Sequence, residues 1–297
     1  MVDFVRMNYN DKSAIEDFIC NSKNFPELRV VLEKHSGVIE YPYKTKLESM
    51  DITITEKKVC IMNSIHKLNN YRKHRVNRNH DDFKYSEIIE NINFIESRLI
   101  NIEKATLSKL EFGLNIEIDF PAKFIIRNNI MMHKKKIHNH NKKFEGRGEL
   151  KQFDHSNYDF KIYDKAKQYN LPKNVIRFEI KHKRSKSFNP YGIHNILDLT
   201  SKENLQMLFE NLMHRFEELT IIDNYRDNPN IPEEVKNEIE QYTSYNFWET
   251  LSDRKFRNKK SELKKRLKQV LDENNLLTIK SDLRNKLKTK FEYLINN

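Results

Sequence analysis

The sequence predicts an α+β fold, in which an antiparallel sheet with packed helices forms the core and a helical C-terminal region follows it. Two stretches, 34–68 and 107–184, contain segments that alternate apolar and polar residues, as strands with one buried face do. Between them, the apolar residues of the segment 81–103 recur at helical intervals. After Pro190 the helical spacing dominates to the end of the chain. Strands followed by a run of helices are typical of an α+β chain.

The N-terminal part is expected to start with a short helix at 13–24, because Ser13 suits the N-cap and Glu16 stands at the capping-box position. The segment 34–68 alternates apolar and polar residues around one glycine and one proline, which predicts two or three strands. We expect the segment 52–62 to be one strand of the sheet.

A helix is predicted at 81–103, because the segment begins with acidic residues that suit a helix N-terminus and then repeats apolar residues at helical spacing. We expect it to pack on the sheet. Strands are predicted at 107–119 and 122–128, followed by a basic loop and by a possible edge strand or turn at 149–153. The two glycines near the end of this loop could let the backbone approach a phosphate.

The C-terminal part is predicted to be helical. Ser201 and Asn204 form a capping signature for a helix that runs to about 219 and packs on the sheet. The segment 223–232 has the Asp, Asn and Pro content of a linker. Beyond it we expect three helices that form a small bundle or a helix-turn-helix-like element on duplex DNA; a tail that covers the sheet or mediates self-association fits the pattern equally. The predicted parts are 1–222 as one α+β domain, 223–232 as the linker and 233–297 as the helical region.

The composition favours a polyanionic partner. The formal net charge is +11, and the basic residues are clustered instead of evenly spread. Ribosomal and membrane-surface proteins share such a charge, so it does not identify the partner alone. The four basic clusters lie at 72–78, 133–147, 181–186 and 254–268.

The chain shows no sign of secretion or membrane insertion. Its two cysteines, Cys20 and Cys60, have no metal-binding spacing and fit a reducing compartment. No apolar run reaches the roughly 18 residues that span a bilayer, and the first residues lack a signal-peptide core. We therefore expect a soluble, cytoplasmic protein without membrane contact.

The segment 158–184 carries the side chains best suited to chemistry. If it forms two adjacent strands, Tyr163, Lys165, Arg177 and Glu179 lie near one another. A phenolate can form a covalent link to a DNA phosphate, and Lys or Arg can neutralise charge on the transferring group. Half-buried structural strands with a packed tyrosine and an Arg–Glu pair explain the same pattern without chemistry.

Two motifs in this segment resemble those of rolling-circle replication initiators of small plasmids and single-stranded DNA phages. A strand of the form (R/K)-I-Y-(D/N)-K corresponds to 161–165, and a following strand of the form R-(F/Y/V)-E corresponds to 177–179. An upstream strand at 107–118 resembles the family strand with an acidic residue and an asparagine, which are Glu111 and Asn115 here. The resemblance covers about 105–200 and implies a nuclease-type sheet.

The resemblance implies roles for particular residues. Tyr163 is the nucleophile, with Lys165 and Arg177 as phosphate clamps, and Tyr158, Tyr169 and Tyr191 remain alternative nucleophiles. Glu111 and Glu179 are the natural ligands for Mg²⁺ or Mn²⁺, with Glu117 and Asp119 behind them. The expected DNA-binding residues are Lys134, Lys135, Lys136, Lys142, Lys143, Arg147, Lys181, Lys183 and Arg184.

The pair His138 and His140 departs from the family pattern. Many such initiators carry a His-hydrophobic-His strand that binds the metal, whereas here the middle residue is Asn139 and the flanks are lysines. The two imidazoles would share one face of a strand and are good metal ligands. A basic loop that contacts DNA is the favoured interpretation.

The resemblance therefore predicts an initiator of DNA replication, a site-specific, metal-dependent endonuclease that nicks one strand at an origin through a covalent tyrosyl link and later rejoins it. Its partners would be single-stranded or hairpin origin DNA, with a host helicase and a homodimer as further expectations. Two alternatives remain. One is a non-catalytic DNA- or RNA-binding regulator of a mobile element, and the other is a relaxase or transposase with the same tyrosine chemistry.

Overall fold

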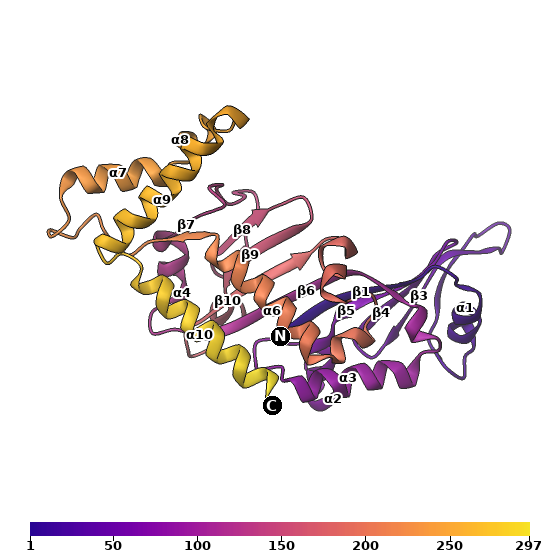
Figure 1. Ribbon diagram of the computed structural model, residues 1–297. Coiled ribbons are helices and arrows are strands. Elements are labelled where there is room, and N and C mark those ends of the chain that lie inside the picture. Colours follow the sequence, from indigo (N-terminus) through magenta and orange to yellow (C-terminus); the bar gives the residue numbers. More distant parts are fainter.

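An antiparallel sheet of nine strands forms the centre of the computed structural model, which describes residues 1–297 (Figure 1). Its strand order is β2-β3-β4-β5-β1-β6-β10-β9-β8, so the N-terminal strand lies in the middle, beside β6. The α+β prediction is confirmed. The strands are β1 (Val2–Tyr9), β2 (Arg29–Leu32), β3 (Ile39–Leu47), β4 (Met50–Ile54), β5 (Val59–Ser64), β6 (Thr106–Glu117), β8 (Leu150–Asp154), β9 (Tyr158–Asp164) and β10 (Val175–His182).

Helices α6 (Lys202–Glu217) and α10 (Thr278–Ile295) cover one face of the sheet, in front of the strands in Figure 1. Phe178 of β10 meets Phe216 of α6 edge to face, with ring centroids 5.4 Å apart. Phe209 of α6 stacks on Phe291 of α10 at 4.0 Å. These contacts fix which face of β10 is apolar, because alternate residues of a strand point to opposite faces.

The N-terminal helices pack on other parts of the sheet. Helices α2 (Ile65–His74) and α3 (Tyr85–Arg98) run along one side of the sheet, and α1 (Ser13–Cys20) lies beside its N-terminal hairpins (Figure 1). A second small sheet pairs β7 (Ile130–His133) with β11 (Leu219–Ile221). No helix is both long enough and apolar enough to cross a membrane.

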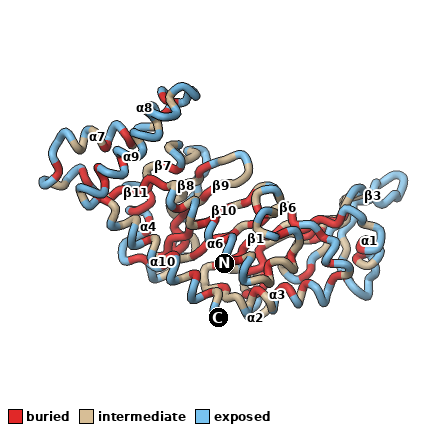
Figure 2. Tube along the Cα trace, viewed as in Figure 1, coloured by how far each residue is buried: buried red, intermediate tan, exposed pale blue.

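The buried apolar residues form two clusters; in Figure 2 the buried stretches run along the central strands and the helices that pack on them. Helices α7 (Glu233–Thr243), α8 (Tyr245–Glu249) and α9 (Arg257–Glu273) build the smaller cluster around Trp248. Helix α10 instead contributes to the larger cluster with Leu283, Leu287 and Phe291. The division of the chain at 223–232 stays a prediction.

Two details of the N-terminal part differ from the prediction. Helix α1 begins at Ser13, but its N-cap is Lys12, and the Ser13 hydroxyl donates to Asp11 Oδ1 at 3.0 Å instead of capping the helix. Glu16 forms an ion pair with Lys12 at 2.8 Å in place of a capping box. The segment 52–62 is not one strand, because β4 and β5 form a hairpin in which the amide of Thr55 donates to the carbonyl of Lys58 at 2.9 Å.

The strand predicted at 122–128 is also wrong. The chain forms the short helix α4 (Ala122–Phe124) and continues as a π-helix to Asn129. The Phe124 amide donates to the Pro121 carbonyl at 3.0 Å and starts the helix, while Ile125 and Ile126 are buried. A short apolar run does not distinguish helix from strand, because both bury such residues.

Candidate active site

Three neighbouring strands bring the predicted site residues together. In the register of β6, β10 and β9, Arg177 lies opposite Asn115 on one side and Tyr163 on the other. Two residues further along β10, Glu179 lies opposite Gly113 and Lys161. These side chains share one face of the sheet, since Phe178 points to the opposite face and packs on Phe216. The adjacent-strand prediction for 158–164 and 175–182 is confirmed.

Gly113 allows the close approach of β6 to β10 at this point. A Cβ atom placed on it would lie 2.4 Å from the carbonyl oxygen of Phe178 and 2.8 Å from the Cα atom of Glu179. Any larger residue would therefore push the two strands apart. The glycine thus sets the position of Glu179 relative to the strand that carries Glu111 and Asn115.

Glu179 is the centre of the site. Its Oε1 accepts from Lys161 Nζ at 2.9 Å, and its Oε2 accepts from Arg177 Nε at 2.8 Å and from the Tyr163 hydroxyl at 3.2 Å. Burial acts to raise the pKa of Glu179, but the charges of Lys161 and Arg177 outweigh it and hold that pKa well below its usual range. The carboxylate is therefore ionised, and both oxygens have partners.

Arg177 joins Glu179 to the N-terminal strand. Its Nη1 donates to Asn115 Oδ1 at 3.0 Å, and its Nη2 lies 3.4 Å from Asp3 Oδ2. Only 2% of Arg177 is exposed. The guanidinium is therefore held between two buried carboxylates. Its N–H donors point in several fixed directions in one plane, so it can bind both carboxylates at once better than a lysine ammonium could.

Lys165 reaches the site from a helix and not from a strand. It is the first residue of α5 (Lys165–Tyr169), which Asp164 caps by accepting from the amide of Lys167 at 2.8 Å. The buried Lys165 Nζ donates to Asn79 Oδ1 at 2.9 Å. Burial, reinforced by the charge of Arg177, lowers its pKa to about 7. Near neutral pH this lysine is thus only partly charged, which weakens it as an electrostatic clamp.

Tyr163 is buried, and 5% of its surface is exposed. Burial and the neighbouring charge of Glu179 raise the pKa of its hydroxyl well above the ordinary value. The ring of Phe144, from the basic loop 134–149, packs edge-on against it with centroids 5.2 Å apart. The loop therefore covers the one tyrosine whose hydroxyl contacts Glu179.

Gly148 lets the end of this loop lie against α5. Its φ is +94°, and a Cβ atom there would lie 2.8 Å from the Cβ of Lys167. The carbonyl of the next residue, Glu149, accepts from the amide of Asp164 at 3.0 Å. The glycine thus serves the close packing of the loop on α5, at the position where a contact to phosphate was expected.

The alternative tyrosines lie outside the Glu179 cluster or on its margin. Tyr169 donates to Asn79 Oδ1 at 2.6 Å and stacks on His80. Tyr158 stacks on His155, and burial raises its pKa to about 12. Tyr191 is partly buried in a short 3₁₀ helix after β10. None of these three hydroxyl groups hydrogen-bonds to a carboxylate.

The two predicted metal ligands, Glu111 and Glu179, face each other across Lys161. Lys161 Nζ lies 2.9 Å from Glu179 Oε1 and 3.4 Å from Glu111 Oε1. Lys181 Nζ is also 3.4 Å from Glu111 Oε1. Burial, followed by the charge of Glu179, raises the pKa of Glu111. A lysine ammonium thus lies between the carboxylates, and no group of three or more His, Cys, Asp or Glu side chains has the arrangement of a metal site.

The other expected ligands are more exposed or isolated. Glu117 is exposed and pairs with Lys173, and the exposed Asp119 lies 3.7 Å from Lys286. The rings of His138 and His140 lie with centroids 4.2 Å apart, in the loop that covers Tyr163. Burial and the nearby Lys151 lower the pKa of His138 to about 4, so it is neutral at physiological pH.

The predicted DNA-contacting residues fall into two groups. Lys135, Lys181 and Lys183 are half-buried; Lys181 is paired with Glu111, and Lys183 Nζ lies 2.7 Å from Asp159. The others are exposed, and most belong to the loop over Tyr163. These exposed residues are Lys134, Lys136, Lys142, Lys143, Arg147 and Arg184.

Two buried residues that the sequence patterns do not single out, Asp3 and Asn79, complete the cluster. Asp3 accepts from Arg177, from Ser64 and from Asn79, whose amide nitrogen is 2.6 Å from Asp3 Oδ2. Asn79 also accepts from Lys165. The alternating pattern of 2–9 was the available signal for a strand that carries Asp3. Nothing in the sequence near 79 indicates its position, because that loop is placed by tertiary contacts.

No family model matches the chain, and no curated protein matches it. Among solved structures, the rolling circle replication initiator protein from Geobacillus stearothermophilus is similar, with 11% sequence identity and a TM-score of 0.43. The match covers 77% of this chain and 89% of that one.

Proposed function

We propose that this chain is a replication initiator that nicks one DNA strand and later rejoins it, as in rolling-circle replication. One observation carries the proposal: the Tyr163 hydroxyl lies 3.2 Å from an ionised carboxylate oxygen of Glu179, beside Arg177. These side chains occupy the tyrosine, arginine and glutamate positions of the K-I-Y-D-K and R-F-E motifs. A nucleophile, a proton acceptor and cations for a phosphate are therefore within one cluster.

The chemical step is an in-line exchange at phosphorus. The Tyr163 oxygen forms a bond to the phosphorus while the bond from phosphorus to one sugar oxygen breaks. The phenol proton passes by way of Glu179 to that leaving sugar oxygen. Arg177 and Lys161 stabilise the charge on the non-bridging oxygens. The reverse attack by the sugar oxygen rejoins the strand and releases the tyrosine, so the bond energy is conserved.

The phosphate reaches Tyr163 only if the loop that carries Phe144 moves. This loop also carries exposed cations, among them Lys142, Lys143 and Arg147. We therefore assign it to contact single-stranded or hairpin origin DNA, whose phosphates would draw the loop away from the tyrosine. Recruitment of a host helicase and formation of a homodimer stay predictions.

A divalent metal does not fit the carboxylates as they are arranged. The Lys161 ammonium already bridges Glu111 and Glu179, and Arg177 holds the second oxygen of Glu179. No step is therefore assigned to Mg²⁺ or Mn²⁺. Dependence on either ion stays a prediction of the resemblance.

The test is formation of a covalent protein–DNA adduct. Purified protein is incubated with labelled single-stranded oligonucleotides that tile the DNA element encoding the chain, with Mg²⁺, with Mn²⁺ or with EDTA. We expect a labelled band that survives denaturing electrophoresis with wild type and disappears with Tyr163→Phe. The matched control is Tyr293→Phe, because Tyr293 is an exposed tyrosine of α10.

An adduct that persists in Tyr163→Phe refutes this nucleophile, and the same substitution at Tyr158, Tyr169 and Tyr191 then identifies the replacement. An adduct that forms equally in EDTA refutes metal dependence alone. If no oligonucleotide yields an adduct, the nicking activity is refuted. Relaxases and transposases share the tyrosine link, and the position of the cut, at a replication origin or elsewhere, separates them.

A non-catalytic DNA- or RNA-binding regulator is the second candidate. It is favoured by the burial of Tyr163 and by the pairing of both Glu179 oxygens, which are also properties of a structural ion-pair network. Tight binding without an adduct on any sequence is its expected signature.

A further inference from the structure

The middle of the basic loop is a strap, residues 140–147, that is anchored to the sheet at both ends. Before the strap, the amide of Asn139 donates to the carbonyl of Gln152 at 2.8 Å. After it, the carbonyl of Glu149 accepts from the amide of Asp164 at 3.0 Å. Because the two partners belong to β8 and β9, both ends of the strap are fixed to rigid strands.

Between these anchors, Phe144 holds the strap against the protein. The hydrogen bonds of the strap stay within the loop, as in the turn that the Arg147 amide closes on the Phe144 carbonyl at 3.1 Å, and no ion pair joins the strap to the rest of the chain. Phe144 is also the only residue of the strap that is not exposed. Its ring packs edge-on against Tyr163, so the strap is closed by this one contact.

Phe144 is the neighbour of Tyr163 that can move aside. The ammonium group of Lys165 lies 5.5 Å from the centroid of the Tyr163 ring, but its hydrogen bond to Asn79 holds it in place. Glu179, which accepts from the Tyr163 hydroxyl, is fixed by two cations. A phosphate can therefore approach the tyrosine only from the side that Phe144 covers.

The surroundings of the strap leave space for the ring to withdraw. A cavity of about 280 Å³ lies between the strap and the start of β8, and Phe144 is one of its lining residues. A cavity of this size can hold a phenyl ring. Next to it, a Cβ atom placed on Gly146 would meet no atom within 4 Å, so the strap backbone is free of packing there. The ring can leave Tyr163 without displacing either anchor.

We propose that Phe144 is an autoinhibitory plug, which closes Tyr163 to any DNA that binds too weakly to displace the strap. This inference rests on the proposed function for the role of Tyr163, and it adds the regulation of that site. The exposed cations Lys142, Lys143 and Arg147 lie on the strap itself. A strand that contacts them favours the open strap, whereas a strand bound elsewhere leaves the strap closed.

The plug makes Phe144 a determinant of selectivity. Only protein with an open strap reacts, so the rate of adduct formation follows the open fraction of the bound protein. Removal of the ring makes all bound protein open. The rate is then unchanged for a DNA that opens the strap by itself and higher for a DNA that does not.

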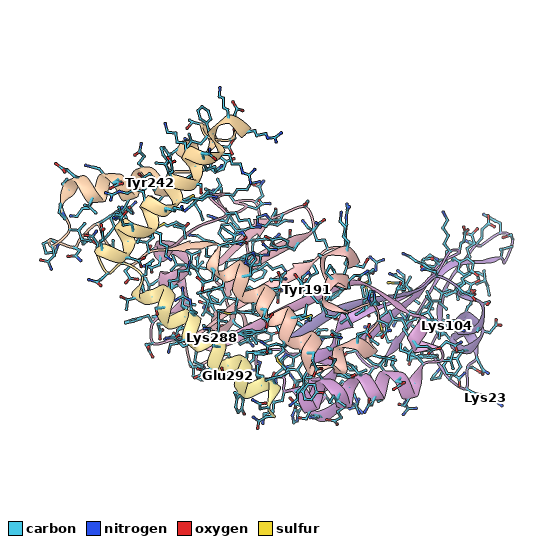
Figure 3. All side chains as sticks on the ribbon, in the orientation of Figure 1. Lys23, Lys104, Tyr191, Tyr242, Lys288 and Glu292 are labelled. Carbon is cyan, nitrogen blue, oxygen red and sulfur yellow. The ribbon has the colours of Figure 1, made fainter.

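The experiment compares rates of adduct formation under single-turnover conditions at saturating DNA. Two oligonucleotides are used, the one on which wild type reacts fastest and a scrambled sequence of the same composition. The variants are Phe144→Ala and Phe144→Leu, and urea unfolding confirms that each is folded. The matched control is Tyr293→Ala, which removes an exposed ring next to Glu292 on α10, the helix in front of the sheet in Figure 3.

We expect Phe144→Ala to react with the scrambled oligonucleotide on the order of 10-fold faster than wild type, since an aromatic contact no longer opposes opening. Phe144→Leu should lie between the two, and the control should match wild type. The rate on the preferred oligonucleotide should change by less than about 2-fold. Slower reaction of Phe144→Ala on both oligonucleotides overturns the inference, because the ring would then position DNA; an unchanged rate on the scrambled one also overturns it.

A second measurement needs no DNA. Hydroxyl-radical oxidation of Tyr163 in the free protein, quantified by mass spectrometry of its peptide, reports how open this side chain is to solvent. We expect faster oxidation in Phe144→Ala, a smaller increase in Phe144→Leu and none in the control. Unchanged oxidation overturns the inference. If no protein forms an adduct but the increase is found, nicking is refuted, while Phe144 is retained as the cover of Tyr163.

Discussion

The cluster around Glu179 and the groove between α9 and α10 are both rich in basic side chains, but the charges are paired in the cluster and partly unpaired in the groove. In the cluster, Asp3, Arg177 and Glu179 are buried, and their charges are paired in a bridge from Asp3 through Arg177 to Glu179. Six basic side chains and two carboxylates line the groove, where Lys264 and Lys268 are exposed without partners. Basic residues of one sequence can therefore stabilise the folded protein at one site and remain available to bind an anionic ligand at another.

The largest expected difference between the two regions is in stability. Arg177→Met leaves Glu179 and Asp3 buried without their shared cation, and we expect the free energy of unfolding to fall by about 3–5 kcal/mol. Lys268→Met, at an exposed position of the groove, should change it by no more than about 0.5 kcal/mol. Urea unfolding of both variants measures this. Equal losses would mean that the groove is also a structural network.

The buried lysine of the cluster predicts a pH dependence. The pKa of Lys165 is lowered to about 7, whereas in the unfolded chain it returns to the ordinary 10.5. Between these values the unfolded state binds more protons, so stability rises with pH, at most by about 1.4 kcal/mol per pH unit.

Urea unfolding at pH 7 and pH 9 tests this slope against Lys165→Met, which should show a smaller increase. Lys135 and Lys151, whose pKa values are each lowered to about 8, titrate in both proteins and cancel in the difference. An identical increase in the variant would show that Lys165 is charged in the folded protein.

The smallest expected effect concerns the tyrosine itself. Tyr163→Phe removes one hydrogen bond to Glu179, which Lys161 and Arg177 continue to hold, so we expect a loss of about 1 kcal/mol in the free energy of unfolding. Thermal and urea unfolding measure it. A loss close to that of Arg177→Met would mark Tyr163 as a structural residue of the network and favour the non-catalytic regulator.

Local patterns predicted the elements that carry these side chains. The alternation at 158–164 and 175–182 placed Tyr163, Arg177 and Glu179 on one face of two strands, and Ser201 capped its helix through the amide of Asn204 at 3.2 Å. The helix predicted at 81–103 is found as Tyr85–Arg98. The prediction was wrong where the local pattern is compatible with both helix and strand. The segment 122–128 is helical and not a strand, because its apolar run suits either element and Pro121 begins a helical turn.

By itself, the sequence determined the α+β class, the pair of motif strands and the excess of basic charge, because periodicity and composition act over a few neighbouring residues. The tertiary structure alone decided which charges meet. It brings Asp3 and Asn79 to Arg177 and Lys165, places the Lys161 ammonium between Glu111 and Glu179, and gathers lysines of α9 and of the loop after β7 into one groove. Such contacts join residues far apart in the chain, and their strength depends on burial and distance, which no local pattern encodes.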